Sequence, residues 1–212
     1  MKPLLLGLLS FALGFTGAVV PGPLLVVVVS ESPRRGVAAG FLAVLGHAAL
    51  EAAMVAALAV GLGFLLRSPL AEASVALVGG CAMLTFSAIM VWHALRGEYT
   101  SNSGRVFPYG PLLGGSVATA LNPYWYVWWA TVASPYVAAS VPLGVVGLLA
   151  FYVGHVLADA AWYVPVSAVV GYGGRRLEDR YLNWLVLACG VLLALFGVKF
   201  LLLASTRLPG LL

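Results

Sequence analysis

The chain has 212 residues, of which 62% are hydrophobic and 8% are charged, and its formal net charge is +4. A soluble domain carries about 25% charged residues, so this chain has too little charge to cover a water-facing surface. The composition excludes a soluble globular domain. The positive charge is also no evidence for a nucleic-acid partner, because no basic stripe or nucleic-acid-binding motif accompanies it.

Long apolar runs follow one another without the period-two alternation of a membrane β-barrel. In a bilayer the backbone must satisfy its own hydrogen bonds, and a continuous apolar run does this as a helix of about 20 residues. We therefore predict an all-α integral membrane protein with six transmembrane helices in one domain. The expected spans are 3–29, 37–66, 73–95, 110–133, 142–170 and 183–205. The first apolar run is longer than a signal-peptide core, so we expect a spanning helix there.

Proline interrupts the first and fourth predicted spans. Pro21, Gly22 and Pro23 break the first span, and Asn122 and Pro123 break the fourth. Proline has no N–H, so each break leaves backbone polar groups at membrane depth, which are tolerated where they line a cavity. We expect all five residues to form part of a substrate-binding site. The alternative is a simple proline kink at each position.

Only two of the seven acidic residues are expected in the middle of a span. These are Glu51 and Asp159, and each follows a histidine by four residues, which places it beside His47 or His155 on one helix face. A charged side chain at the centre of a membrane helix costs about 2.5–3.5 kcal/mol on insertion scales. The four residues predict a site that couples transport to protons or cations. The alternative is a pair of purely structural polar contacts.

The two histidine–acid pairs belong to an internal repeat. The segment 46–53 recurs at 154–161 with an offset of 108, and the same offset pairs Cys81 with Cys189. A unit of three helices forces the second copy to lie upside down in the membrane. We therefore predict two inverted three-helix repeats, over about 1–95 and 110–205, with the binding site near the midplane between them.

Aromatic residues follow the second proline break. Trp125 and Trp129 share one helix face, and we expect them to line the site and to offer cation–π contacts to an ammonium group. The alternative is that they pack or form an interfacial belt. Both cysteines are interpreted as small buried apolar residues.

The basic residues predict an orientation in the plasma (inner) membrane. Positive side chains favour the cytoplasmic side. The odd-numbered loops hold most of them: Arg34, Arg35, Arg96, Arg105, Arg175, Arg176 and Arg180. We therefore expect the odd-numbered loops in the cytoplasm and both termini outside.

Taken together, these motifs resemble the LysE/RhtB-type exporters of the lysine exporter superfamily. The resemblance covers nearly the whole chain. Its marks are Pro21-Gly22-Pro23, the Gly36/Gly40 helix after a short basic loop, Asn122-Pro123, and the stretch from Gly154-His155 to Tyr163. Many amino-acid exporters of this group carry lysine after the Asn-Pro pair. Tyr124 stands there in this chain, so the substrate stays open.

The resemblance implies a secondary transporter that exports amino acids or related small metabolites by proton or cation antiport with alternating access. Its partners would be a small solute, a proton or cation and the lipid bilayer, and Gly36/Gly40 is compatible with a homo-oligomer as well as with internal packing. No nucleotide-binding loop or nucleophile motif is present, so we expect neither an enzyme nor a cofactor.

Two relatives within the superfamily supply alternatives. One is a divalent metal-ion exporter, because histidine and carboxylate ligands spaced by four residues can hold a divalent cation. The other is a membrane thiol–disulfide reductant-transfer protein, which places cysteines beside the prolines of its first and fourth helices. In this chain the prolines have no cysteine neighbours.

Overall fold

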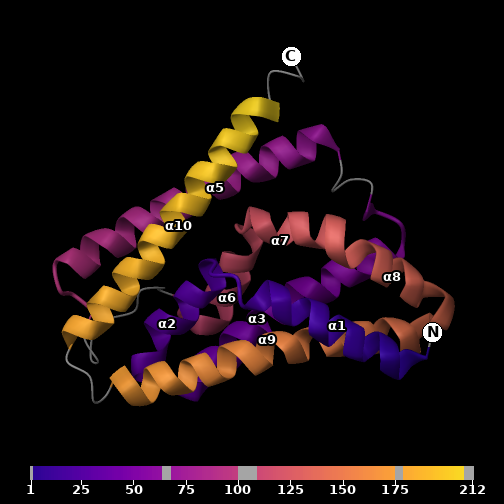
Figure 1. The fold of residues 1–212 in the computed structure, drawn as a ribbon, viewed down its shortest axis with the longest axis horizontal. Helices are drawn as coiled ribbons and strands as arrows, with labels where there is room; N and C mark the ends of the chain where they lie inside the picture. Colours follow the sequence, from indigo (N-terminus) through magenta and orange to yellow (C-terminus); the bar gives the residue numbers. More distant parts are fainter. Residues whose placement is uncertain (1, 64–67, 100–108, 175–178, 208–212) are drawn as a thin grey trace.

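The computed structural model describes residues 2–63, 68–99, 109–174 and 179–207, and every regular element within these ranges is a helix (Figure 1). Several basic residues used to predict the orientation lie outside the described ranges: Arg67, Arg105, Arg175 and Arg176. The large apolar side chains that remain exposed are distributed over the outer helix faces, as expected for a chain whose solvent is lipid.

The first half of the chain contains one broken helix and two long continuous ones. Its elements are α1 (Pro3–Ala18), α2 (Pro23–Arg35), α3 (Val37–Ala59) and α5 (Pro69–Leu95). The axes of α1 and α2 differ by 77°. The turn occurs where predicted, because Pro23 occupies the first helical position of α2 and extended Gly22 precedes it as the N-cap.

Helix α2 is longer than the sequence prediction. We expected the first span to end near residue 29 and Arg34 and Arg35 to lie in a loop, but α2 continues to Arg35, and only Gly36, with φ +56°, separates it from α3. The prediction that Glu31 lies in a loop or at a helix end was also wrong. Glu31 is 1% exposed within α2, and its carboxylate lies 3.1 Å from Nε of Arg35, one turn later.

The second half is broken at a corresponding point. Its elements are α6 (Gly110–Ala120), α7 (Pro123–Trp128), the π-helical segment η1 (Trp129–Ala133), α8 (Ser134–Ser140), the 3₁₀ turn η2 (Val141–Leu143), α9 (Gly144–Gly174) and α10 (Asp179–Arg207). Asn122 caps α7, since its side-chain oxygen accepts a hydrogen bond from the Tyr124 amide at 3.1 Å. The break therefore follows from Asn-Pro chemistry: proline at the first helical position and asparagine as the N-cap.

Four helical stretches of the described chain are long and apolar enough to cross a bilayer, and the bent α1–α2 pair supplies a fifth candidate. One stretch, Pro123–Gly173, has 51 residues, whereas about 20 residues suffice for one crossing. This stretch does not run straight. The chain turns at Gly144, which has φ +64°, and α9 runs back past α8 (Figure 1). The predicted number of six spans stays a prediction.

The helices pack in two groups. Helix α1 lies along α9, α3 lies between α6 and α9, and α2 crosses α3, α6 and α9. Helices α5 and α10 pair with each other at the upper edge of the view (Figure 1). Glycines permit the closest approaches. A methyl group at Gly154 would overlap the carbonyl oxygen of Gly7, and one at Gly46 would overlap that of Leu112. Both breaks thus face the centre of the helix bundle.

Candidate functional site

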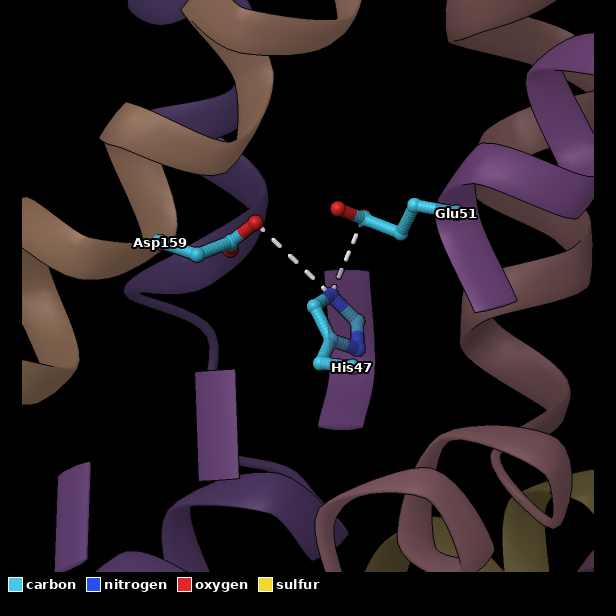
Figure 2. A group of neighbouring side chains, drawn as sticks. All are labelled: His47, Glu51 and Asp159. Carbon is cyan, nitrogen blue, oxygen red and sulfur yellow. Dashed lines mark ion pairs between the residues drawn. The ribbon is translucent and has the colours of Figure 1, made fainter. Parts of the chain in front are cut away.

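A cluster of histidines and acids lies where α3 meets α9. Figure 2 shows the carboxylates of Glu51 and Asp159 approaching the His47 ring from two sides. Nε2 of His47 lies 3.0 Å from Oε1 of Glu51 and 3.7 Å from Oδ2 of Asp159. His155 completes the cluster, with its Nε2 2.9 Å from the same Oε1 of Glu51. The pairing therefore crosses between the two helices, so that one carboxylate oxygen of Glu51 serves two imidazole rings.

The cluster is removed from bulk solvent. The exposed fraction is 0% for Glu51, 3% for Asp159, 5% for His155 and 8% for His47. Within the described residues, both carboxylate oxygens of Glu51, Oδ2 of Asp159 and Nδ1 of His155 have no partner of good hydrogen-bond geometry. Buried polar atoms are normally satisfied, and exceptions call for a functional explanation. These atoms are available to a proton, an ion or a polar solute.

Thr119 binds the remaining nitrogen of His47. Its hydroxyl lies 2.6 Å from Nδ1 of His47 and donates a hydrogen bond to the carbonyl oxygen of Gly115 at 2.7 Å. The residue is 1% exposed on α6. The side chain thus connects the first half of the broken second-repeat helix to the histidine–acid cluster.

Aromatic rings surround His155. Its ring centroid lies 4.8 Å from that of Trp128 and 5.2 Å from that of Trp129, and it stacks nearly parallel to Phe151 at 6.3 Å. On the remaining side, Nδ1 of His155 faces the backbone of α1, where a methyl group at Gly14 would lie only 2.6 Å away. Aromatic faces attract cations, so this pocket suits a histidine that carries a positive charge during part of a cycle.

A cavity joins the cluster to both helix breaks. It encloses about 650 Å³ of empty space, counting its open mouth, which is within the usual range of about 300–1,000 Å³ for small-molecule sites. Its walls come from α1, α2, α3, α6, α7 and α9, with single side chains from α5 and α10. The two breaks meet at this cavity, since a methyl group at Gly22 would lie 3.6 Å from Nδ2 of Asn122.

Comparison with known proteins decides the family. Residues 15–204 match the family described as LysE type translocator. The chain belongs to the LysE type translocator family. It is therefore a multi-pass membrane protein that moves a small solute, and it is not an enzyme. No curated protein and no solved structure matches it.

Most of the residues predicted to form the translocator's site line this one cavity. They are Pro21, Gly22, His47, Glu51, Asn122, Trp125, Trp129, His155 and Asp159. Pro23 and Pro123 are not among the described lining residues. Pro23 is buried as the first residue of α2, and Pro123 packs against α5, where a methyl group at Gly79 would lie 2.6 Å from its Cδ. Their place is at the start of each helix beyond the break.

Sequence reasoning missed several lining residues, chiefly Gly14, Gly17, Thr119, Trp128 and Tyr163. Trp128 belongs to the aromatic run singled out after Asn122-Pro123, but its helix face differs from that of Trp125 and Trp129. Thr119 carried no signal, because its partner His47 is 72 residues away. Gly14 precedes the first break by two turns, and a glycine in an apolar helix commonly indicates close packing.

Three of the translocator's cluster residues could hold a metal ion. His47, Glu51 and Asp159 each offer one ligand atom, and these atoms lie within 4.8 Å of one another. Imidazole and carboxylate are ligands that zinc and related divalent cations accept. The group is buried and opens onto the transport cavity, so a cation there would be cargo or a coupling ion.

Proposed function

We propose that the protein exports amino acids or related small metabolites from the cell in exchange for protons or cations. The observation that carries this proposal is the position of the buried histidine–acid cluster, which opens onto the same cavity as both helix breaks. A solute in the cavity and a charge on the cluster therefore influence each other directly. Such contact is what coupled transport needs, since each ligand must change the free energy of binding of the other.

The cavity's chemistry suits a solute that carries both an ammonium and a carboxylate group. Helices α2 and α7 both begin at the breaks, and a helix N-terminus has a partial positive charge that favours a carboxylate. Acidic side chains and the faces of Trp125 and Trp129 suit an ammonium group. The buried Nε1–H groups of both tryptophans have no hydrogen-bond partner among the described residues, so they are free to donate to a bound solute.

The cluster is suited to proton exchange. Oε1 of Glu51 lies within 3.0 Å of two imidazole nitrogens, and histidine changes charge near physiological pH. The arrangement can hold different numbers of protons without large movements. We propose that Glu51 and Asp159 exchange protons with the cavity, that His47 and His155 tune this exchange, and that proton entry drives solute exit.

Two inverted three-helix halves within a single transmembrane domain would supply alternating access. Close glycine contacts support this proposal. Gly46 in α3 and Gly154 in α9 are 108 residues apart, as are Gly7 and Gly115. Gly154 packs on the Gly7 backbone, whereas Gly115 packs on the backbone of Ala43, three residues before Gly46. The α1–α9 and α6–α3 contacts thus use equivalent glycines. With the odd-numbered loops in the cytoplasm, α2 leads from the cavity to the cytoplasmic side.

Reconstituted protein tests the coupling. We expect wild-type proteoliposomes to move amino acids against their gradient when a pH gradient is imposed. Glu51→Gln and Asp159→Asn should each abolish this pH-driven accumulation, while solute exchange without a gradient continues. Full pH-driven transport in both variants would show that the cluster does not couple transport to protons.

Divalent metal export is the second candidate, favoured by the three converging ligand atoms of His47, Glu51 and Asp159. A thermal-shift screen of purified protein against amino acids and divalent metals separates the two, because a ligand that binds only the folded state raises the apparent stability. Stabilisation by an amino acid supports the organic-solute exporter. Stabilisation by a metal alone, lost in Glu51→Gln, would make metal export the leading function.

A further inference from the structure

The two histidines of the cluster differ in their second nitrogen. Nδ1 of His47 has a hydroxyl partner, Thr119, at 2.6 Å. Nδ1 of His155 has no hydrogen-bond partner among the described residues, although it is buried. The sequence repeat contains the same asymmetry. At the offset of 108, the residue that corresponds to Thr119 is Phe11, which has no hydroxyl to offer.

Thr119 restricts His47 to one tautomer. A threonine hydroxyl has one proton, and here that proton is donated to the Gly115 carbonyl at 2.7 Å. The carbonyl can only accept, so the hydroxyl must act as an acceptor toward the ring. Nδ1 of His47 therefore carries a hydrogen, and its Nε2 is the nitrogen that faces Glu51 and Asp159. His47 can exchange a proton only at Nε2.

His155 has no such restriction. Its Nε2 lies 2.9 Å from Oε1 of Glu51, while its Nδ1 lies at the cavity wall against Gly14 and is unpartnered within the described residues. The ring therefore has one nitrogen toward the acid and one available to a water molecule or solute. This is the geometry of a proton relay through an imidazole, in which one nitrogen receives a proton as the other releases one.

Given the transport role proposed above, we propose that Thr119 is a positioning residue that fixes the tautomer of His47, and that His155 is the ring through which protons pass between the cavity and Glu51. A proton from the cavity binds to Nδ1 of neutral His155. The hydrogen on Nε2 then moves to Oε1 of Glu51, leaving His155 neutral and Glu51 protonated. The proton returns by the reverse steps when the cavity opens to the other side of the membrane.

Few other charged or titratable groups face the two rings. Helices α1 and α6 carry none along Pro3–Ala18 and Gly110–Ala120. The groups on the remaining neighbouring elements are Glu31 and Arg35 of α2, which pair with each other, Tyr124 and Tyr126 of α7, Tyr136 of α8, and Tyr152, Asp159 and Tyr163 of α9. Because the tyrosines are neutral near pH 7, the protonation of the rings depends mainly on Glu51 and Asp159.

Nitrogen NMR of the full chain in detergent tests the proposal without relying on transport. The chain has three histidines, so ¹⁵N-histidine labelling gives three ring systems, and His93→Gln identifies the one outside the cluster. We expect His47 to keep a proton on Nδ1 across the neutral pH range, and His155 to change its pattern over that range. Thr119→Val should remove the fixed pattern of His47, and Thr119→Ser, which keeps the hydroxyl, should retain it.

Transport measurements then connect the tautomer to coupling. Thr119→Val is expected to lower pH-driven transport about five- to tenfold, the size expected when a buried donor loses its acceptor, and to shift the pH profile, whereas Thr119→Ser keeps both. An unprotonated Nδ1 on His47, or an identical spectrum in Thr119→Val, would overturn the role of Thr119. A ring of His155 that does not respond to pH would overturn its role as the relay. Fixed tautomers without any pH-driven transport would instead contradict the proposed coupling and leave the positioning role intact.

Discussion

His155 of α9 lies 2.9 Å from Glu51 of α3, although the sequence pairs His155 with Asp159, four residues later on its own helix. The contact ties the two long helices together at the cavity. It also makes Glu51 the centre of the cluster, because Oε1 of Glu51 is within 3.0 Å of both histidines. Asp159 is more peripheral, at 3.7 Å from His47.

A double-mutant cycle should detect the crossed pairing. We expect His155→Asn and Glu51→Gln to show a coupling energy of about 1–3 kcal/mol in unfolding free energy, the range for residues in direct contact within a polar network. His155→Asn with Asp159→Asn should couple more weakly. Thermal or denaturant unfolding in detergent provides the measurement. A stronger coupling for the pair within α9 would contradict the crossed arrangement.

Gly14 should be intolerant of a side chain. A methyl group there would lie 2.6 Å from Nδ1 of His155, so Gly14→Ala must push the ring away from α1, and overpacking of this kind costs about 1–3 kcal/mol. Gly22→Ala is a matched control, because its methyl group would meet Nδ2 of Asn122 at an ordinary 3.6 Å. We expect the melting temperature to fall in Gly14→Ala only. Equal melting temperatures would show that His155 does not occupy this position.

Much of this site follows from the sequence. Glu51 and Asp159 stand out because charge in the middle of an apolar helix is costly, and proline shows where the helices must break. The sequence does not show which histidine faces which acid, because crossed pairing depends on the register between α3 and α9. It also conceals Thr119, whose contact with His47 spans 72 residues, and Glu31, which burial in α2 separates from water.

The backbone contacts between α3 and α6 predict a severe effect of small substitutions. Methyl groups at Gly46 and Gly115 would overlap the carbonyl oxygens of Leu112 and Ala43. Backbone atoms cannot move aside as a flexible side chain can, so each alanine variant should separate the helices. We expect loss of more than about 3 kcal/mol of stability, at the upper end for overpacked sites, visible as aggregation in size-exclusion chromatography. Gly63→Ala, which meets only a flexible leucine side chain, should behave as wild type.

Glu31 and Arg35 form a one-sided buried ion pair. Glu31 is 1% exposed and Arg35 keeps a side-chain exposure of 36%, so removal of the arginine leaves a buried carboxylate without its cation. Arg35→Ala should therefore destabilise the protein by about 1–3 kcal/mol, below the usual cost for a fully buried pair because Arg35 remains partly solvated. Adding Glu31→Gln to Arg35→Ala should restore part of the melting temperature. A double variant less stable than Arg35→Ala would exclude this explanation.

Asn122 has two roles that different substitutions can separate. Its side-chain oxygen caps α7 through the Tyr124 amide at 3.1 Å, while its Nδ2 lies opposite Gly22 at the junction of the two helix breaks. Asn122→Ala removes both groups and should cost about 1 kcal/mol of stability. Asn122→Ser keeps a capping oxygen but has no amide nitrogen.

If the amide contacts solute, both variants should bind the stabilising amino acid about five- to tenfold more weakly, the loss expected for one hydrogen bond, while only Asn122→Ala loses stability without ligand. Thermal shifts recorded with and without solute separate these two effects. Wild-type affinity in Asn122→Ser would place the solute away from Asn122 and assign the residue to capping alone. A loss of affinity with unchanged stability would place the solute at the point where the two broken helices meet.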